Sequence, residues 1–99
     1  MISVQQTANK VVISGILTRA TITRAFEKKY RQLVSDDNIT FDLANVTQID
    51  TAGLAWVLML IEQAAMNACQ IVLTNVPEDL LKLAKLSAVD TFLPLEVVN

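Results

Sequence analysis

The feature that most restricts the fold of this chain is an unbroken run of eight apolar residues, Leu54 to Ile61. The run follows Asp50 and Thr51, and such residues are typical of a helix N-terminus, where a side-chain oxygen accepts hydrogen bonds from free backbone N–H groups. It is much shorter than the roughly 18 residues needed to cross a bilayer. We therefore expect a buried helix over about residues 52–67.

Gly53 lies in the first turn of this expected helix. Glycine in a helix costs about 1 kcal/mol relative to alanine, so its presence indicates that some group approaches the backbone closely there. We call Asp50, Thr51 and Gly53 the helix-start motif.

One side of the helix is predicted to pack in the core and the other to contact a partner. At about 100° per residue, the stripe assigned to the core contains Leu54, Leu58, Ile61 and Ala65. Clustered aromatic and methionine side chains on the remaining face usually mark a contact surface, unless another segment of the chain covers them. The predicted partner face consists of Ala52, Trp56, Met59 and Gln63, with Leu60 on its flank.

The rest of the chain alternates between strand-like and helix-like segments. Strands are expected in "ISVQQT", "KVVISG", "ITFDL" and "QIVLTNV", the last as an interior strand, and "TFLPLEVV" could add an edge strand. Further helices are expected from Thr23 to Val34, capped by Thr23, and from Pro77 onward, with Pro77 as first helical residue. This order predicts one α/β domain over residues 1–99: a sheet with helices packed against it.

Composition excludes several kinds of function. The chain has no histidine, one cysteine (Cys69) and two glycines, which removes Ser-His-Asp and Cys-His catalysis, most zinc sites and phosphate-cradling loops. A net charge of −2 argues against nucleic acid as a partner. We expect a binding module and no enzyme, with no metal and no cofactor. The N-terminus shows no signal-peptide pattern, so a cytoplasmic protein without direct membrane insertion is expected.

A basic segment coincides with the first expected helix. It contains Arg19, Arg24, Lys28, Lys29 and Arg31. Such a segment is either a solvated helix face or a contact with anionic lipid headgroups.

The stretch "DLANVTQIDTAGL" resembles the Asp-Ser/Thr-x-Gly-Leu helix start of STAS domains, the module named for sulfate transporters and anti-sigma-factor antagonists. The likeness extends over about residues 11–94, from "VVISGILT" to the "LAKL" segment and Pro94. It implies a STAS-like small mixed β-sheet with helices packed largely on one side.

Two branches of this family give different expectations. In anti-sigma-factor antagonists, the hydroxyl residue after the helix-start aspartate, or its neighbour, is phosphorylated by a partner kinase; the possible site here is Thr51. Those proteins commonly carry Gly-Glu-Leu-Asp at the preceding bend, whereas this chain has "GILT", with Ile16 and Thr18 in place of the acids.

The second branch is the cytoplasmic STAS subunit of the Mla phospholipid-transport ABC complex, which maintains outer-membrane lipid asymmetry. Resemblance to it implies a non-enzymatic accessory subunit that binds the ABC transporter ATPase subunit (MlaF-like), within a complex with a membrane permease. The protein would be peripheral to the inner membrane through that partner, with Thr51 at the contact. We favour this branch, with the phosphorylated antagonist as the alternative and a small-ligand or nucleotide-binding domain as a third reading.

Overall fold

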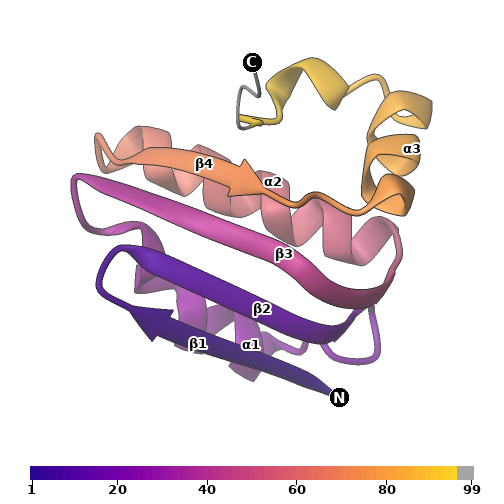
Figure 1. The fold of residues 1–99 in the computed structure, drawn as a ribbon, viewed down its shortest axis with the longest axis horizontal. Helices are drawn as coiled ribbons and strands as arrows, with labels where there is room; N and C mark the ends of the chain where they lie inside the picture. Colours follow the sequence, from indigo (N-terminus) through magenta and orange to yellow (C-terminus); the bar gives the residue numbers. More distant parts are fainter. Residues whose placement is uncertain (96–99) are drawn as a thin grey trace.

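The computed structural model of the chain describes residues 1–95, which form a four-stranded sheet and three α-helices (Figure 1). The elements are β1 (Ile2–Thr7), β2 (Lys10–Leu17), α1 (Arg24–Tyr30), β3 (Asn38–Ile49), α2 (Thr51–Met66), β4 (Gln70–Thr74) and α3 (Glu78–Leu86). Two short 3-10 helices, Arg31–Val34 and Asp90–Phe92, follow α1 and α3. The α/β fold with a small mixed sheet, expected from the sequence, is confirmed.

The sheet has the order β1-β2-β3-β4. β1 and β2 form an antiparallel hairpin through a turn in which Ala8 has a φ of 54°. β2 pairs in parallel with β3, and β3 in parallel with β4, so each of these connections needs a crossover. α1 and α2 provide the two crossovers, and both lie behind the sheet in Figure 1.

Alternation along the strands separates a buried face of the sheet from an open one. On β2, Val11 and Ile13 are fully buried under the helices. Val12 and Ser14, which alternate with them along the strand, are half-buried on the other face. The core also takes in side chains from β3, β4 and the helices, among them Ile39, Phe41, Leu43, Leu73, Leu80 and Ala84. One apolar core thus joins the sheet to all three helices.

The face of α2 that enters this core differs from the predicted stripe. Its buried residues are Gly53, Leu54, Trp56, Val57, Leu60 and Ala64. Trp56 is 2% exposed and Leu60 fully buried, so their prediction as exposed partner contacts is wrong. The reason is that α1 covers this face: the ring of Phe26 packs on that of Trp56 with centroids 5.1 Å apart. Ala65, which we had assigned to the core, is exposed.

Smaller differences concern the ends of elements. The first helix is α-helical only to Tyr30 and then tightens to a 3-10 turn, while Thr23 caps it as expected, accepting from Phe26 N–H at 3.1 Å. Pro77 is the residue before the first helical position of α3, not that position itself.

β4 was expected inside the sheet but lies at its end. The edge strand anticipated from "TFLPLEVV" is reduced to a single bridge from Leu95 to Leu73 among the described residues, and positions 96–98 of that stretch lie outside them. None of the helices in residues 1–95 is long and apolar enough to cross a membrane.

Candidate partner-binding site at the start of α2

Asp50 links the start of α2 to the loop that follows β2. One carboxylate oxygen accepts a hydrogen bond from Gly53 N–H at 3.0 Å and caps the helix. The other oxygen accepts from Arg19 N–H, also at 3.0 Å. Because one side chain holds both segments, the first turn of α2 has a defined position against the β2–α1 loop.

The same contacts lower the pKa of Asp50, with the backbone N–H of Arg19 as the largest cause and that of Gly53 as a further one. Both donors favour the charged carboxylate. The folded pKa therefore lies below the value in the unfolded chain. The contribution of these hydrogen bonds to stability is present above the unfolded pKa and is lost as the pH falls through the lowered one.

Gly53 allows α2 to begin directly against the end of β2. A Cβ atom at this position would collide with the carbonyl oxygen of Leu17 and would lie 2.8 Å from Cγ1 of Ile49. The expectation that some group approaches the backbone at Gly53 is therefore confirmed. The group belongs to the chain itself, so Gly53 supports the site without being free to contact a partner.

The β2–α1 loop beside Asp50 is held by threonine hydroxyls. Thr21 Oγ1 donates to the carbonyl of Ile16 at 2.6 Å and accepts from Thr18 N–H at 3.1 Å. Thr18 Oγ1 in turn accepts from Ala20 N–H at 3.3 Å. This loop includes the "GILT" bend, where Ile16 and Thr18 stand in place of the acids and threonine hydroxyls add to the backbone hydrogen bonds.

Thr51 is the first residue of α2 and its side chain is exposed. Since Asp50 supplies the cap, the Thr51 hydroxyl is not required for capping. Of the other predicted partner contacts, Ala52, Met59 and Gln63 are half-buried, whereas Trp56 and Leu60 are buried.

The outward-facing stripe of α2 includes two residues that the sequence analysis did not single out. Ala55 and Glu62 are exposed and follow Thr51 at positions i+4 and i+11, so they share its side of the helix, with Met59 between them. We call Thr51, Ala55, Met59 and Glu62 the outer stripe of α2. The i, i+4, i+8, i+11 spacing from Thr51 would have identified it, had Thr51 and not Trp56 been taken as the centre of the exposed face.

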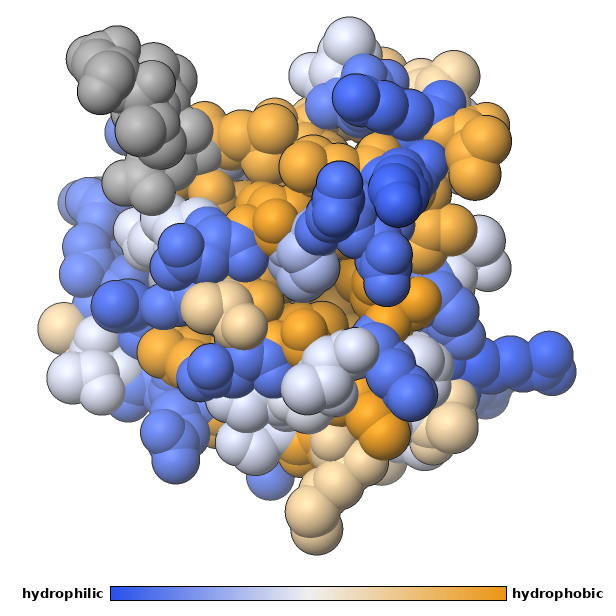
Figure 2. All heavy atoms as spheres, turned by 45° about the vertical axis from the view of Figure 1, so that its right-hand side comes forward, coloured by the Kyte–Doolittle hydropathy of each residue, from blue (hydrophilic) through white to orange (hydrophobic). Residues whose placement is uncertain are grey.

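Apolar side chains are also exposed elsewhere on the surface. Figure 2, which brings forward the side with α3, shows apolar atoms on the surface between polar ones. Large exposed apolar residues in the described chain include Met66, Leu86 and Phe92.

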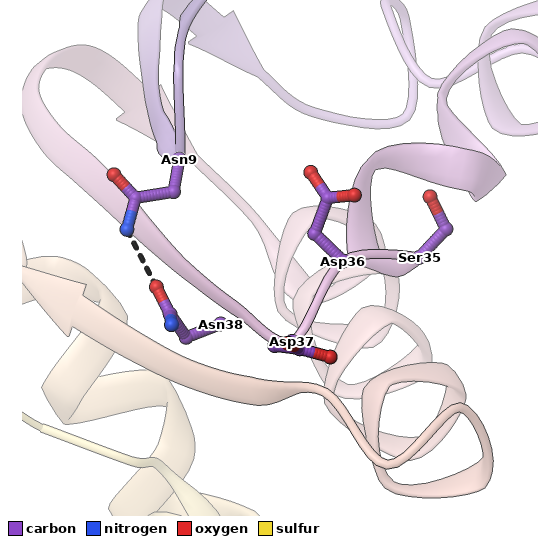
Figure 3. A pocket seen from close by; sticks show the side chains of 5 residues that line it. All are labelled: Asn9, Ser35, Asp36, Asp37 and Asn38. Atoms are coloured by element: carbon purple, nitrogen blue, oxygen red, sulfur yellow. Dashed lines mark hydrogen bonds between the residues drawn. The ribbon is translucent and has the colours of Figure 1, made fainter.

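A polar hollow of about 410 Å³ lies at the other end of the sheet, where β3 begins (Figure 3). It is lined by Asn9, Ser35, Asp36, Asp37 and Asn38. Asn9 donates from its side chain to that of Asn38 across the hollow. Because Asn38 begins β3 and Asp50 follows its end, this hollow is separate from the site at α2.

The arrangement defines a small mixed α/β domain that presents the start of one helix. Solved structures with this fold include the anti-sigma-factor antagonist SpoIIAA in its unphosphorylated form, at 16% identity and a TM-score of 0.70, covering 98% of this chain and 89% of that one. An anti-sigma-factor antagonist from Mycobacterium paratuberculosis matches at 19% identity and a TM-score of 0.73, covering 99% and 86%. A putative antagonist from Thermotoga maritima matches at 13% identity and a TM-score of 0.68, covering 98% and 86%.

A family model described as "Mlab, STAS domain" matches residues 2–96. The chain therefore belongs to this family of STAS domains. No curated protein matches it. At their low identities, the solved structures establish the fold alone.

Proposed function

We propose that this STAS domain is a non-enzymatic accessory subunit that binds the ATPase of a phospholipid-transport ABC complex through the start and outer stripe of α2. The observation that carries the proposal is the exposed Thr51 on a helix start that Asp50 fixes to the β2–α1 loop. A surface whose backbone is held in place before binding loses little entropy on association. The match to the family described as "Mlab, STAS domain" supports this choice of partner.

In this proposal the protein is cytoplasmic and reaches the inner membrane through its partner. The ATPase stands in a complex with a permease, and the whole maintains outer-membrane lipid asymmetry. The revised contact set is Thr51, Ala52, Ala55, Met59, Glu62 and Gln63. Trp56 and Leu60 contribute indirectly, since they anchor α2 in the core.

Replacing Thr51 with glutamate should weaken ATPase binding at least about tenfold, because the larger charged side chain would have to be desolvated in the contact. The domain should remain folded, since a glutamate in the first helical turn interacts favourably with the helix dipole. Titration of the purified ATPase with each variant measures the effect, and thermal unfolding checks the fold. Thr51→Ser should bind normally.

The matched control for this experiment is Gln5→Glu, which adds the same charge to an exposed position on β1, outside the proposed contact set. It should bind within about twofold of the native chain. Equal losses in Thr51→Glu and Gln5→Glu would show that net charge and not the helix start determines binding, and would contradict the proposal.

The alternative function is that of an anti-sigma-factor antagonist switched by phosphorylation of Thr51. One observation favours it: the hydroxyl is exposed at a helix N-terminus, where a phosphate would be stabilised by free N–H groups and the helix dipole. Against it, the neighbouring bend carries Ile16 and Thr18 in place of acids, and its hydrogen bonds come from threonine hydroxyls.

We expect Thr51 to be unmodified in cells. Intact-mass measurement of the natively expressed protein should show the unphosphorylated mass, with a Thr51→Ala variant as reference for any modification elsewhere. A substantial phosphorylated fraction that disappears in Thr51→Ala would make the antagonist the better assignment.

A further inference from the structure

Charge is distributed very unevenly along this chain. The segment 19–31 holds five of its eight lysines and arginines and a single anion, Glu27, for a local charge of +4. Because the whole chain has a formal charge of −2, the remaining residues carry −6. A region so different in sign from the rest of the molecule produces a directed local field.

The structure places these cations on the surface of α1 and of the residues on either side of it. Arg24, Lys28 and Arg31 are spaced like the exposed face of a helix, and together with Glu27 they line a shallow groove of about 410 Å³. Lys29 lies over the ring of Tyr30 at 5.4 Å from its centroid. Within residues 1–95, the one ion pair joins Lys10 and Asp42, on β2 and β3. None of the groove cations forms an ion pair there, and Glu27 is the single anion among them.

The groove lacks the apolar centre that a protein–protein contact needs. The large exposed apolar residues of the described chain are Met1, Met66, Val72, Leu86, Phe92 and Leu95, and none belongs to α1. Protein interfaces depend on buried aromatic and aliphatic anchors and are poor in lysine. Adsorption to a charged lipid surface requires only closely spaced cations, each strengthening binding roughly fivefold near an anionic bilayer.

From this combination we infer that the basic face of α1, formed by Arg24, Lys28 and Arg31, binds the phosphate-bearing headgroups of anionic phospholipids at a bilayer surface. Binding is peripheral and electrostatic, with no segment inserted. Arg19, in the loop before α1, adds a fourth exposed cation. The inference does not depend on the proposed ATPase partner, since it concerns a different surface and is tested on the domain alone.

The test is co-sedimentation of the full 99-residue chain with vesicles of phosphatidylcholine alone or with 30 mol% phosphatidylglycerol. At low salt the chain should bind the anionic vesicles at least about tenfold more tightly than the neutral ones. Binding should fall steeply with added salt, because exposed charges are screened. The triple variant Arg24→Gln, Lys28→Gln, Arg31→Gln should lose at least about tenfold in affinity for the anionic vesicles.

The matched control removes the same charge elsewhere, in Lys10→Gln, Lys82→Gln, Lys85→Gln, all at exposed positions outside α1. It should keep binding within about threefold of the native chain, and circular dichroism should show all three proteins folded. Equal binding to neutral and anionic vesicles, or equal losses in the two triple variants, overturns the inference. Tighter binding to polyglutamate than to the vesicles at equal anion concentration also overturns it, in favour of an acidic protein.

Discussion

Replacing Trp56 with alanine should lower the free energy of unfolding by about 3–5 kcal/mol, the range observed when a large aromatic side chain is removed from a core. The side chain is 2% exposed and lies between the body of the core and α1, where it packs on Phe26. Its removal leaves a cavity and also loosens α1, which buries no residue fully and depends on such half-buried contacts. Urea denaturation of the isolated domain measures the loss.

Two further variants show whether the loss arises from packing. Trp56→Phe keeps an aromatic ring against Phe26 and removes a buried indole N–H that has no acceptor among the described residues, so its cost should be well below that of alanine. Met66→Ala truncates a large apolar side chain of the same helix that is 73% exposed, and should change stability by no more than about 0.5 kcal/mol. A Trp56→Ala protein as stable as Met66→Ala would mean that Trp56 does not lie in the core.

The second large effect is expected at Gly53. Helix propensity alone would make Gly53→Ala stabilising by about 1 kcal/mol. The added methyl group, however, collides with the carbonyl oxygen of Leu17, and a backbone atom in a strand cannot rotate away as a side chain can. We expect a net loss of about 2 kcal/mol or more, as for overpacking at a site that cannot relax. Thermal and chemical unfolding of the variant both report this loss.

A second substitution in the same helix separates the effect of helix propensity on stability from that of the steric collision at Gly53. Ala55, one half-turn further on, is exposed, so Ala55→Gly tests propensity alone and should cost about 1 kcal/mol. If Gly53→Ala proved more stable than the native chain, this result would contradict the close approach of α2 to β2.

The sequence allowed most of the architecture to be predicted because each element carries local signals. The β1–β2 hairpin, the Thr23 cap and the start of α2 all follow from short-range chemistry and are found close to where they were expected. The position of β4 at the end of the sheet could not be derived in this way. An apolar run in a strand indicates that its faces are covered, but it does not reveal whether one or both edges of the strand are paired with other strands.

The orientation of α2 was not predictable by periodicity because the helix is apolar on nearly all sides from Leu54 to Ile61. A hydrophobic stripe locates the buried face only when polar residues mark the opposite one. Here the polar markers are at the two ends, Thr51 and Glu62, and they lie on the same side of the helix. The site itself, at the helix start, was identified from residue types, while its geometry depends on a contact between Asp50 and Arg19 that is distant in sequence.

The position of Trp56 gives the molecule a built-in optical probe. It is the only tryptophan in the chain, and it sits beneath α1 with the ring of Phe26 against it. The emission wavelength of Trp56 and its quenching by added iodide or acrylamide therefore report whether α1 is packed on α2. No fluorescent label has to be attached to the protein. The same signal follows α1 when vesicles or a partner are added, so movement of this helix can be distinguished from unfolding of the sheet, which circular dichroism records.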